Sequence, residues 1–383
     1  MAAIGRVRRG NPRAIPHLGE DRPRTPLSGF IGVISKDEIR YALRAREHTP
    51  SVVGRASKEL PAKATLLDLQ LSLAPDARMD GILRNKINAI SFFSNSLFVA
   101  AADPGLYAHL QRLASGERCV FFAGLPGTGK SLLSHQLTHL AHALGRTVHM
   151  LQWDVARPVF EASAAGQRYP VVHGVTHGVI RKAAGQWARQ AVGQWHQRYP
   201  EAGHMLIGET PFVGHRLIEL AHRHADAAEP LLQMACFVVP VPSQAVRDFL
   251  EAERQRRSVR PLHAQEREDA PPQVLRDLWR HLAGVAPALG VHADVPMSAV
   301  EVSYDPVLYQ AVYQRLLTQR QVLVLPMGTI LPTTTLSVYD FAVPRHDVVP
   351  TVEEVTRFIG EVEQQYPDLD VLQQDIDHWY VLS

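Results

Sequence analysis

The chain has 383 residues, of which 46% are hydrophobic and 20% are charged, and its formal net charge is +2 at pH 7. This length can hold one large core or two smaller ones, and the near-neutral charge does not require a nucleic acid or a membrane as partner. No run of about 18 apolar residues is present, so we expect no membrane-spanning helix.

The two cysteines, Cys119 and Cys236, both lie in apolar runs. This placement predicts buried small hydrophobes in a reducing compartment rather than a disulfide. The N-terminus has no apolar signal core, and its prolines argue against an amphipathic presequence. We therefore expect a cytoplasmic protein.

The N-terminal part divides into two segments. Residues 1–28 combine four prolines with arginines and glycines, which predicts a flexible basic tail. Residues 29–118 predict a mainly helical extension. A helix over 106–114 is expected there, after the Asp103-Pro104-Gly105 turn and before Gly116.

Residues 119–330 alternate between apolar runs and helical periodicity. Strands are expected at 119–123, 147–153, 204–209, 234–239 and 322–325, and helices at 131–144, 175–197, 217–225, 272–283 and 304–318. Pro240 and Pro242 are expected to end the fourth strand. Such alternation predicts an α/β fold with a doubly wound, mostly parallel sheet and flanking helices.

Residues 331–383 form the last predicted segment. It has a short β run at 335–341 and a helix that starts at the capping box of Thr351 and Glu354. The apolar face of that helix is expected to consist of Val352, Val355, Phe358, Ile359 and Val362. The segment is either an appended small α/β subdomain or part of the same layered fold.

The most informative motif lies between the first predicted strand and the helix after it. Its sequence matches G-x-x-x-x-G-K-[ST] at every fixed position. Glycines let successive N–H groups turn toward phosphate oxygens, and the helix start adds partial positive charge. A chance glycine turn before a core helix is the alternative. The residues expected to bind nucleotide are Gly124, Leu125, Pro126, Gly127, Thr128, Gly129, Lys130, Ser131 and Leu132.

Residue usage supports a specific role for Lys130. The chain contains 34 arginines and 6 lysines, so a lysine at this position indicates a need for a compact ammonium group. Lys130 is expected to reach the β- and γ-phosphates of ATP, and the Ser131 hydroxyl to bind Mg²⁺.

The motif and its flanks resemble the P-loop NTPase superfamily, and residues 119–330 resemble its small-molecule and nucleotide kinases. No Asn-Lys-x-Asp string of a GTPase follows the loop, the third strand lacks the Asp-Glu pair of motor ATPases, and no transporter signature is present. The resemblance implies a kinase-like nucleotide-binding domain, without identifying a subfamily.

In those kinases a carboxylate often ends the second strand beside the acceptor hydroxyl. Asp154 stands there, and the resemblance implies that it orients or deprotonates the acceptor. Arg157, three residues later, is a candidate for binding an anionic group or the travelling phosphoryl. The alternatives are a helix cap for Asp154 and a solvated surface arginine for Arg157.

Glu209 ends the third strand, where the family places an acid that holds Mg²⁺ directly or through water. The alternative is an ordinary glutamate at the end of a strand. The charged segment 251–260 resembles the lid of these kinases, whose arginines close over the phosphates. Arg254 and Arg257 are the candidates, and a solvated charged helix is the alternative.

We therefore predict an ATP- and Mg²⁺-dependent phosphotransferase that acts on a hydroxyl or phosphate of a small molecule. A kinase for nucleic-acid ends and a nucleotide-gated regulatory ATPase are the competing readings. The sequence does not identify the acceptor or the oligomeric state.

Overall fold

The computed structural model describes residues 98–381, apart from 173, 292–301, 334 and 342–343. All of them lie in the second of two units into which the chain divides, Thr65–Ser383. The predicted tail, 1–28, and most of the predicted helical extension lie outside the described residues.

The fold is built on a six-stranded sheet in the order β5-β4-β1-β3-β2-β6, and every neighbouring pair is parallel. All five residues of β1 are buried, as expected for a strand covered on both faces. The predicted parallel α/β sheet is therefore confirmed. The strands are β1 (Cys119–Ala123), β2 (Thr147–Gln152), β3 (His204–Thr210), β4 (Cys236–Pro242), β5 (Gln321–Met327) and β6 (His346–Asp347).

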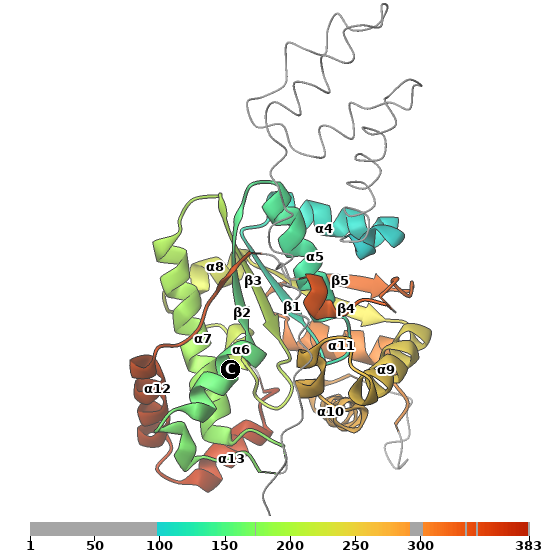
Figure 1. The fold of residues 1–383 in the computed structure, drawn as a ribbon. Helices are drawn as coiled ribbons and strands as arrows, with labels where there is room; N and C mark the ends of the chain where they lie inside the picture. Colours follow the sequence, from blue (N-terminus) through green and yellow to red (C-terminus); the bar gives the residue numbers. More distant parts are fainter. Residues whose placement is uncertain (1–97, 173, 292–301, 334, 342–343, 382–383) are drawn as a thin grey trace, which may run out of the picture. The chain divides into compact units, whose positions relative to one another are not determined.

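Helices flank the sheet (Figure 1), and the core has two layers. Val120 and Phe122 point into a layer shared with α4 and α5, whereas Phe121 points into a layer shared with α6, α7, α11 and α12. The α-helices are α4 (Pro104–Gly116), α5 (Lys130–Ala143), α6 (Trp153–Ala162), α7 (Gly178–Arg198), α8 (Glu229–Met234), α9 (Gln244–Val259), α10 (Pro272–Val285), α11 (Pro306–Leu316), α12 (Val352–Gln365) and α13 (Leu369–Asp377). The 3₁₀ helices are η2 (Val99–Ala102), η3 (Gly166–Arg168), η4 (Ile218–Leu220), η5 (Ala264–Glu268), η6 (Pro287–Leu289) and η7 (Val338–Phe341).

The predicted helix over 217–225 is wrong, because only η4 forms there. Leu217 adopts a left-handed backbone conformation with φ 61°. Arg189 donates hydrogen bonds to the carbonyl oxygens of Glu219, His222 and His224, and Arg320 donates one to the carbonyl oxygen of Leu220. In a helix, such oxygens would accept hydrogen bonds from backbone N–H groups. Buried side chains from other elements therefore hold this segment in an irregular path.

Two further expectations about strands are wrong. The predicted β run at 335–341 does not form: no strand is present at 335–337, and η7 occupies 338–341. The Asp340 carboxylate of η7 accepts a hydrogen bond from the Ser337 backbone at 2.7 Å. The fourth strand also continues through Pro240 and Pro242. Its pairing with β1 ends at Val238, and beyond that point only β5 pairs with it. Proline is tolerated where one side of a strand has no partner.

The C-terminal residues join the same layered fold. β6 pairs with β2 at the edge of the sheet, and α12 packs against α7. The capping box of Thr351 and Glu354 is confirmed, with both of its hydrogen bonds present. Four of the five predicted core residues of α12 are buried, and the exception is Val352, which is 66% exposed.

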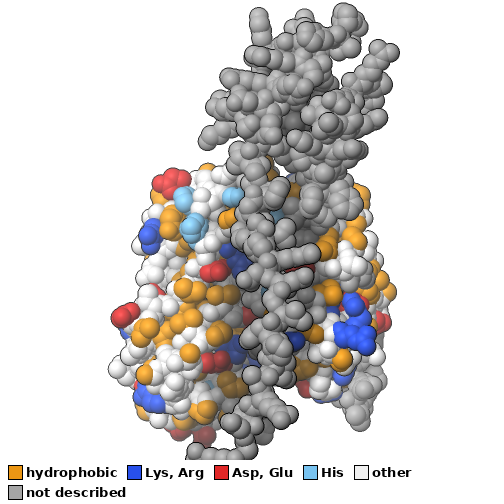
Figure 2. Space-filling model, in the orientation of Figure 1, with side chains coloured by type: hydrophobic (Ala, Val, Ile, Leu, Met, Phe, Trp, Pro, Cys, Tyr) orange, Lys and Arg blue, Asp and Glu red, His pale blue; other side chains and the backbone are white. Residues whose placement is uncertain are grey.

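The described helices include none that is both long and apolar enough to span a bilayer. Cys119 and Cys236 are buried and unpaired, as predicted. Figure 2 shows acidic and basic side chains interspersed over the visible face, outside the atoms drawn in grey, rather than gathered in one patch of a single charge.

Gly185, in the middle of α7, is required by a close approach of Glu219. A Cβ atom at this position would overlap the Glu219 carboxylate, which is 5% exposed and bonds to His215 at 2.7 Å. We expect Gly185→Ala to lower the free energy of unfolding by about 2–4 kcal/mol, because the carboxylate cannot move without breaking buried polar interactions. Urea denaturation measures the change.

Gly360, in α12, provides the matched control. Nothing lies within 4 Å of the position that its Cβ would take. Gly360→Ala should therefore stabilise the protein by up to about 1 kcal/mol through helix propensity. Equal effects of the two substitutions would contradict the packing argument.

Candidate functional site

The glycine-rich loop joins β1 to α5 at the carboxyl end of the sheet. Gly127 and Gly129 have φ of 73° and 84°, in the left-handed region that glycine adopts without strain. At Gly124 a Cβ atom would overlap the hydroxyl of Tyr309, which is fully buried. The glycines at these positions are thus explained by backbone conformation and by close packing.

Lys130 lies in the first turn of α5 and is only 5% exposed. Its ammonium donates a hydrogen bond to the Leu125 carbonyl at 2.8 Å, and the Thr128 hydroxyl donates to the same oxygen at 2.8 Å. Burial lowers the pKa of Lys130, and the negative charges of Glu209 and Asp154 oppose that shift. The loop therefore surrounds a buried ammonium group that has further donors available to a ligand.

Ser131 and Glu209, the two predicted metal ligands, lie next to each other. The Ser131 hydroxyl donates a hydrogen bond to Oε1 of Glu209 at 2.6 Å, and the Gln152 side chain donates to Oε2 at 3.0 Å. β3 lies beside β1 in the sheet, with Glu209 in register with Phe122. This pairing brings Glu209 to the beginning of α5.

Leu132, the last residue predicted to contact nucleotide, is half-buried, and its side chain packs against the core layer below α5. Any contribution to the loop must therefore come from its backbone. Leu125 is fully buried as well, and its carbonyl oxygen is the group that meets Lys130 and Thr128.

Asp154 is expected to end the second strand, but β2 ends at Gln152 and Asp154 lies in the first turn of α6. Asp154 is exposed at the surface, yet the protein around it partly desolvates its carboxylate. This burial raises its pKa, and repulsion from Glu209 adds to the shift, whereas the charges of Lys130, Arg157 and Arg216 oppose it. Asp154 is therefore electrostatically coupled to the loop lysine.

Arg157 pairs with an acid of its own helix. Its guanidinium bonds to both carboxylate oxygens of Glu161, at 3.2 and 2.9 Å, and Thr176 also donates to Glu161 at 2.8 Å. Its positive charge still acts on Asp154. The structure thus gives Arg157 a salt bridge within α6, in addition to its electrostatic effect on the site.

The two predicted lid arginines differ in their surroundings. Arg254 forms an ion pair with Asp269, which also accepts a hydrogen bond from Tyr339 at 2.9 Å. The charge of Arg254 contributes to the lowered pKa of Lys130, so this arginine lies within electrostatic range of the loop. Arg257 instead bonds to Glu266 at 3.0 Å and to the Thr333 carbonyl at 2.7 Å, which ties α9 to neighbouring segments.

Arg247 contacts the loop directly, although sequence reasoning did not select it. It is 1% exposed and donates hydrogen bonds to the carbonyls of Pro126 and Gly127, both at 3.1 Å. A salt bridge with Glu251 at 2.9 Å orients the guanidinium. The only feature of the sequence that points to Arg247 is its position in the first turns of the helix after β4.

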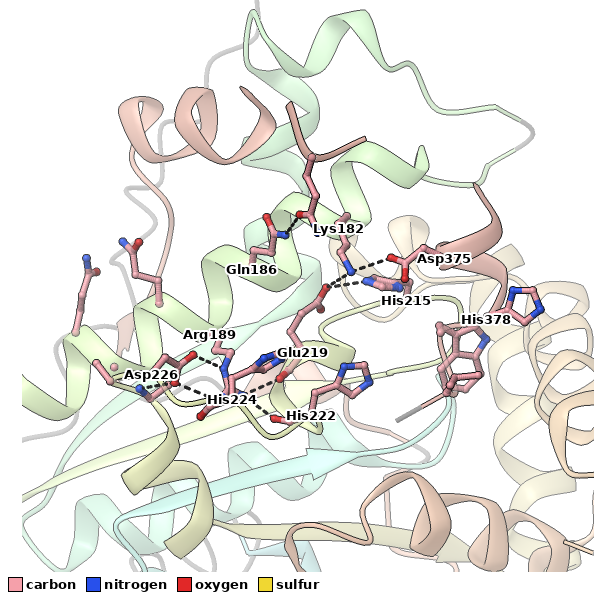
Figure 3. A pocket seen from close by; sticks show the side chains of 18 of the residues that line it. Lys182, Gln186, Arg189, His215, Glu219, His222, His224, Asp226, Asp375 and His378 are labelled. Carbon is pink, nitrogen blue, oxygen red and sulfur yellow. Dashed lines mark hydrogen bonds and ion pairs between the residues drawn. The ribbon is translucent and has the colours of Figure 1, made fainter. Parts of the chain in front are cut away.

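Two pockets of the described residues lie outside the glycine loop. The larger, of about 980 Å³, is lined by α7, residues 215–228 and the C-terminal helices. Figure 3 shows Lys182, His215 and Asp375 grouped around the carboxylate of Glu219. The smaller, of about 320 Å³, is lined by Arg247, Trp279 and Tyr304 among others. No residue of Gly124–Ser131 lines either pocket.

Comparison of the chain with protein-family models finds no match, and no curated protein matches it significantly. The function is therefore inferred from the residues and their geometry alone.

Proposed function

We propose that this chain is an ATP- and Mg²⁺-dependent phosphotransferase whose acceptor is a small molecule with a hydroxyl or phosphate group. One observation carries the proposal. Lys130 and the Ser131–Glu209 pair lie where β1 and β3 end, and Asp154 follows the adjacent strand β2, within electrostatic range of Lys130. Ligands of open α/β sheets bind at the carboxyl ends of the strands.

Each residue then has a chemical role. The backbone N–H groups of the loop and the Lys130 ammonium would bind the phosphates. Ser131 and Glu209 would hold Mg²⁺, which supplies charge neutralisation when bound and usually keeps one or two protein ligands beside phosphate oxygens. In the part of the chain that the structure describes, no group of three or more His, Cys, Asp and Glu side chains is arranged to hold a metal ion.

Asp154 would accept the proton of the acceptor hydroxyl. Its raised pKa makes it a stronger base than an ordinary aspartate, while it remains close enough to Lys130 to sense that charge. Arg254 would neutralise charge on the transferred group after leaving Asp269. This arrangement describes a P-loop kinase mechanism in which the protein contributes position and charge.

Two serines in α5 test the assignment of the metal ligand. Ser131→Ala should remove the Mg²⁺-dependent part of ATP affinity, because it deletes the hydroxyl beside Glu209. Ser134→Ala deletes a hydroxyl that donates to the Ser131 carbonyl, at 3.0 Å, and should leave Mg²⁺ dependence intact. Titration of a fluorescent ATP analogue with Mg²⁺ or with EDTA measures both effects.

If Ser131→Ala binds as tightly with Mg²⁺ as the wild type does, Ser131 is not a metal ligand. Phosphotransfer itself is tested by ADP release. We expect release that rises several-fold with the correct acceptor, whereas slow release that is insensitive to every acceptor would favour a regulatory ATPase.

A further inference from the structure

A pair of arginines, one of which interacts electrostatically with Asp154, has no role in the mechanism above. Arg181 extends from α7, and its Nη1 donates a hydrogen bond to the Gly214 carbonyl at 2.7 Å. Arg216, in the turn after β3, donates from Nη1 to the Val213 carbonyl at 2.6 Å. A Cβ atom on Gly214 would lie 2.9 Å from Nη1 of Arg216 and 3.4 Å from Nη1 of Arg181. Both guanidinium groups therefore sit against the same glycine.

The absence of acidic partners distinguishes this pair. Within the described residues, neither arginine forms a salt bridge, and Nε of Arg181 is buried without a hydrogen-bond partner. Other buried arginines each pair with a carboxylate, namely Arg189 with Asp226 and Glu229, Arg247 with Glu251, and Arg320 with Glu229. Arg181 is 9% exposed and lacks such compensation. A buried charge without a partner is costly, and a bound anion would offset that cost.

The surroundings of the pair are positive. Burial lowers the pKa of Arg181 to about 10, and repulsion from Arg216 contributes to that shift. Burial also lowers the pKa of Arg216, and repulsion from Arg157 contributes there. Two acids beyond salt-bridge distance have the opposite effect: Asp154 raises the pKa of Arg216, and Asp377 raises the pKa of Arg181. Both carboxylates are exposed and Arg216 is half-buried, so Arg216 is the more accessible member of the pair.

The turn that carries Arg216 is held in an unusual conformation. Phe212, His215 and Leu217 all have φ near 60°, although none is a glycine. Phe212 and Arg216 exchange two backbone hydrogen bonds of 3.1 Å, which close the turn. Left-handed conformations at such residues cost stability and concentrate at functional sites. Here they place Arg216 beside Arg181.

We propose that Arg181 and Arg216 bind a phosphate group carried by the acceptor, next to Asp154. The assignment rests on the proposed phosphotransfer, because it makes the acceptor a phosphorylated small molecule. Guanidinium groups match phosphate oxygens in geometry, and two of them balance the charge of about −1.5 to −2 that a phosphate monoester carries at pH 7. A neutral sugar or nucleoside would leave the two arginines without a counter-charge.

Inorganic phosphate is the probe, and the full chain carries Lys130→Ala in every sample so that the glycine loop cannot account for binding. Isothermal titration should detect phosphate binding to this background. Adding Arg216→Gln should raise the Kd about tenfold to a hundredfold, the range for losing a hydrogen bond to a charged group. Adding Arg181→Gln should act in the same direction, and Arg216→Lys should lose less than Arg216→Gln.

Arg223→Gln is the matched control, since its side chain is 62% exposed and lies in the same segment. It should leave the Kd within about twofold, as expected for a surface charge. Circular dichroism shows whether each variant is folded. If Arg181→Gln unfolds, the proposal is tested by the variants at Arg216, which is only half-buried.

Phosphate binding that is absent in the Lys130→Ala background, or unchanged by Arg216→Gln, would overturn the arginine site and leave the proposed phosphotransfer intact. Acetate that binds better than phosphate would overturn the phosphate assignment. Failure of the wild type to bind an ATP analogue would instead overturn phosphotransfer, whatever the phosphate titrations show.

Discussion

Replacing Lys130 with alanine should abolish nucleotide binding while leaving the fold intact. The ammonium is buried inside the glycine loop, and hydrogen bonds to charged groups contribute about 1.5–3 kcal/mol each. Because the ammonium would bind two phosphates, we expect affinity for a fluorescent ATP analogue to fall at least about a hundredfold. Alanine is a strong helix former, and it removes a buried charge, so thermal unfolding should not shift downward by much.

Lys130→Arg provides the comparison. Arginine preserves the charge but brings a larger, planar group to a buried position where the compact ammonium donates to the Leu125 carbonyl. We expect it to bind ATP nearly as poorly as the alanine variant. Binding or phosphorylation at wild-type levels by Lys130→Ala would refute the role of the loop.

The second large effect is expected at Asp154. Asp154→Asn should retain ATP affinity and lower the phosphotransfer rate by about 10²- to 10⁴-fold, the usual contribution of a general base. A base acts only when ionised, so the wild-type rate should fall as the pH drops through the pKa of Asp154. Burial raises that pKa above the ordinary value of 3.8, so the acid limb should lie at correspondingly higher pH. The limb should disappear in the asparagine variant.

Asp370→Asn is a suitable control, because Asp370 is an exposed acid of α13 and is not among the charges that shift the pKa of Lys130 or of Asp154. It should leave both the rate and the pH profile nearly unchanged. An unchanged rate in Asp154→Asn would reduce Asp154 to a favourable acid at the beginning of α6. Steady-state rates measured from pH 4 to 9 with saturating ATP distinguish these outcomes.

Much of this architecture could be predicted from local sequence patterns. The apolar run before Gly124 is β1, the helix after it is α5, and the predicted strands at 147–153 and 204–209 correspond to β2 and β3. Because strands of a parallel sheet end on one side, the positions of Asp154 and Glu209 near the loop followed from the order of elements. Their pairing with Lys130 and Ser131 still required the register of neighbouring strands.

The interactions that sequence reasoning did not find depend on side chains from distant elements. Arg247 contacts the loop although more than a hundred residues separate them in the sequence. Arg181 and Arg216 lie against the same glycine because residues of the turn after β3 adopt left-handed backbone conformations. Arg247 and Arg216 stand out in the sequence only by following a predicted strand, and no local pattern separates Arg181 from the many other arginines of this chain. The irregular path of 217–225 has the same origin, since buried arginines take its carbonyl oxygens.

The sheet gains its last strand late in synthesis. β2, which ends next to Asp154, has β6 as its outer neighbour, and β6 is encoded close to the C-terminus. At about 5–20 residues per second, the ribosome needs on the order of ten seconds or more to travel from one strand to the other. During that time the outer edge of β2 lacks its final neighbour, and unpaired strand edges promote self-association. Loss of the last few dozen residues would make this temporary hazard permanent, so nascent chains and truncated chains should share a tendency to aggregate.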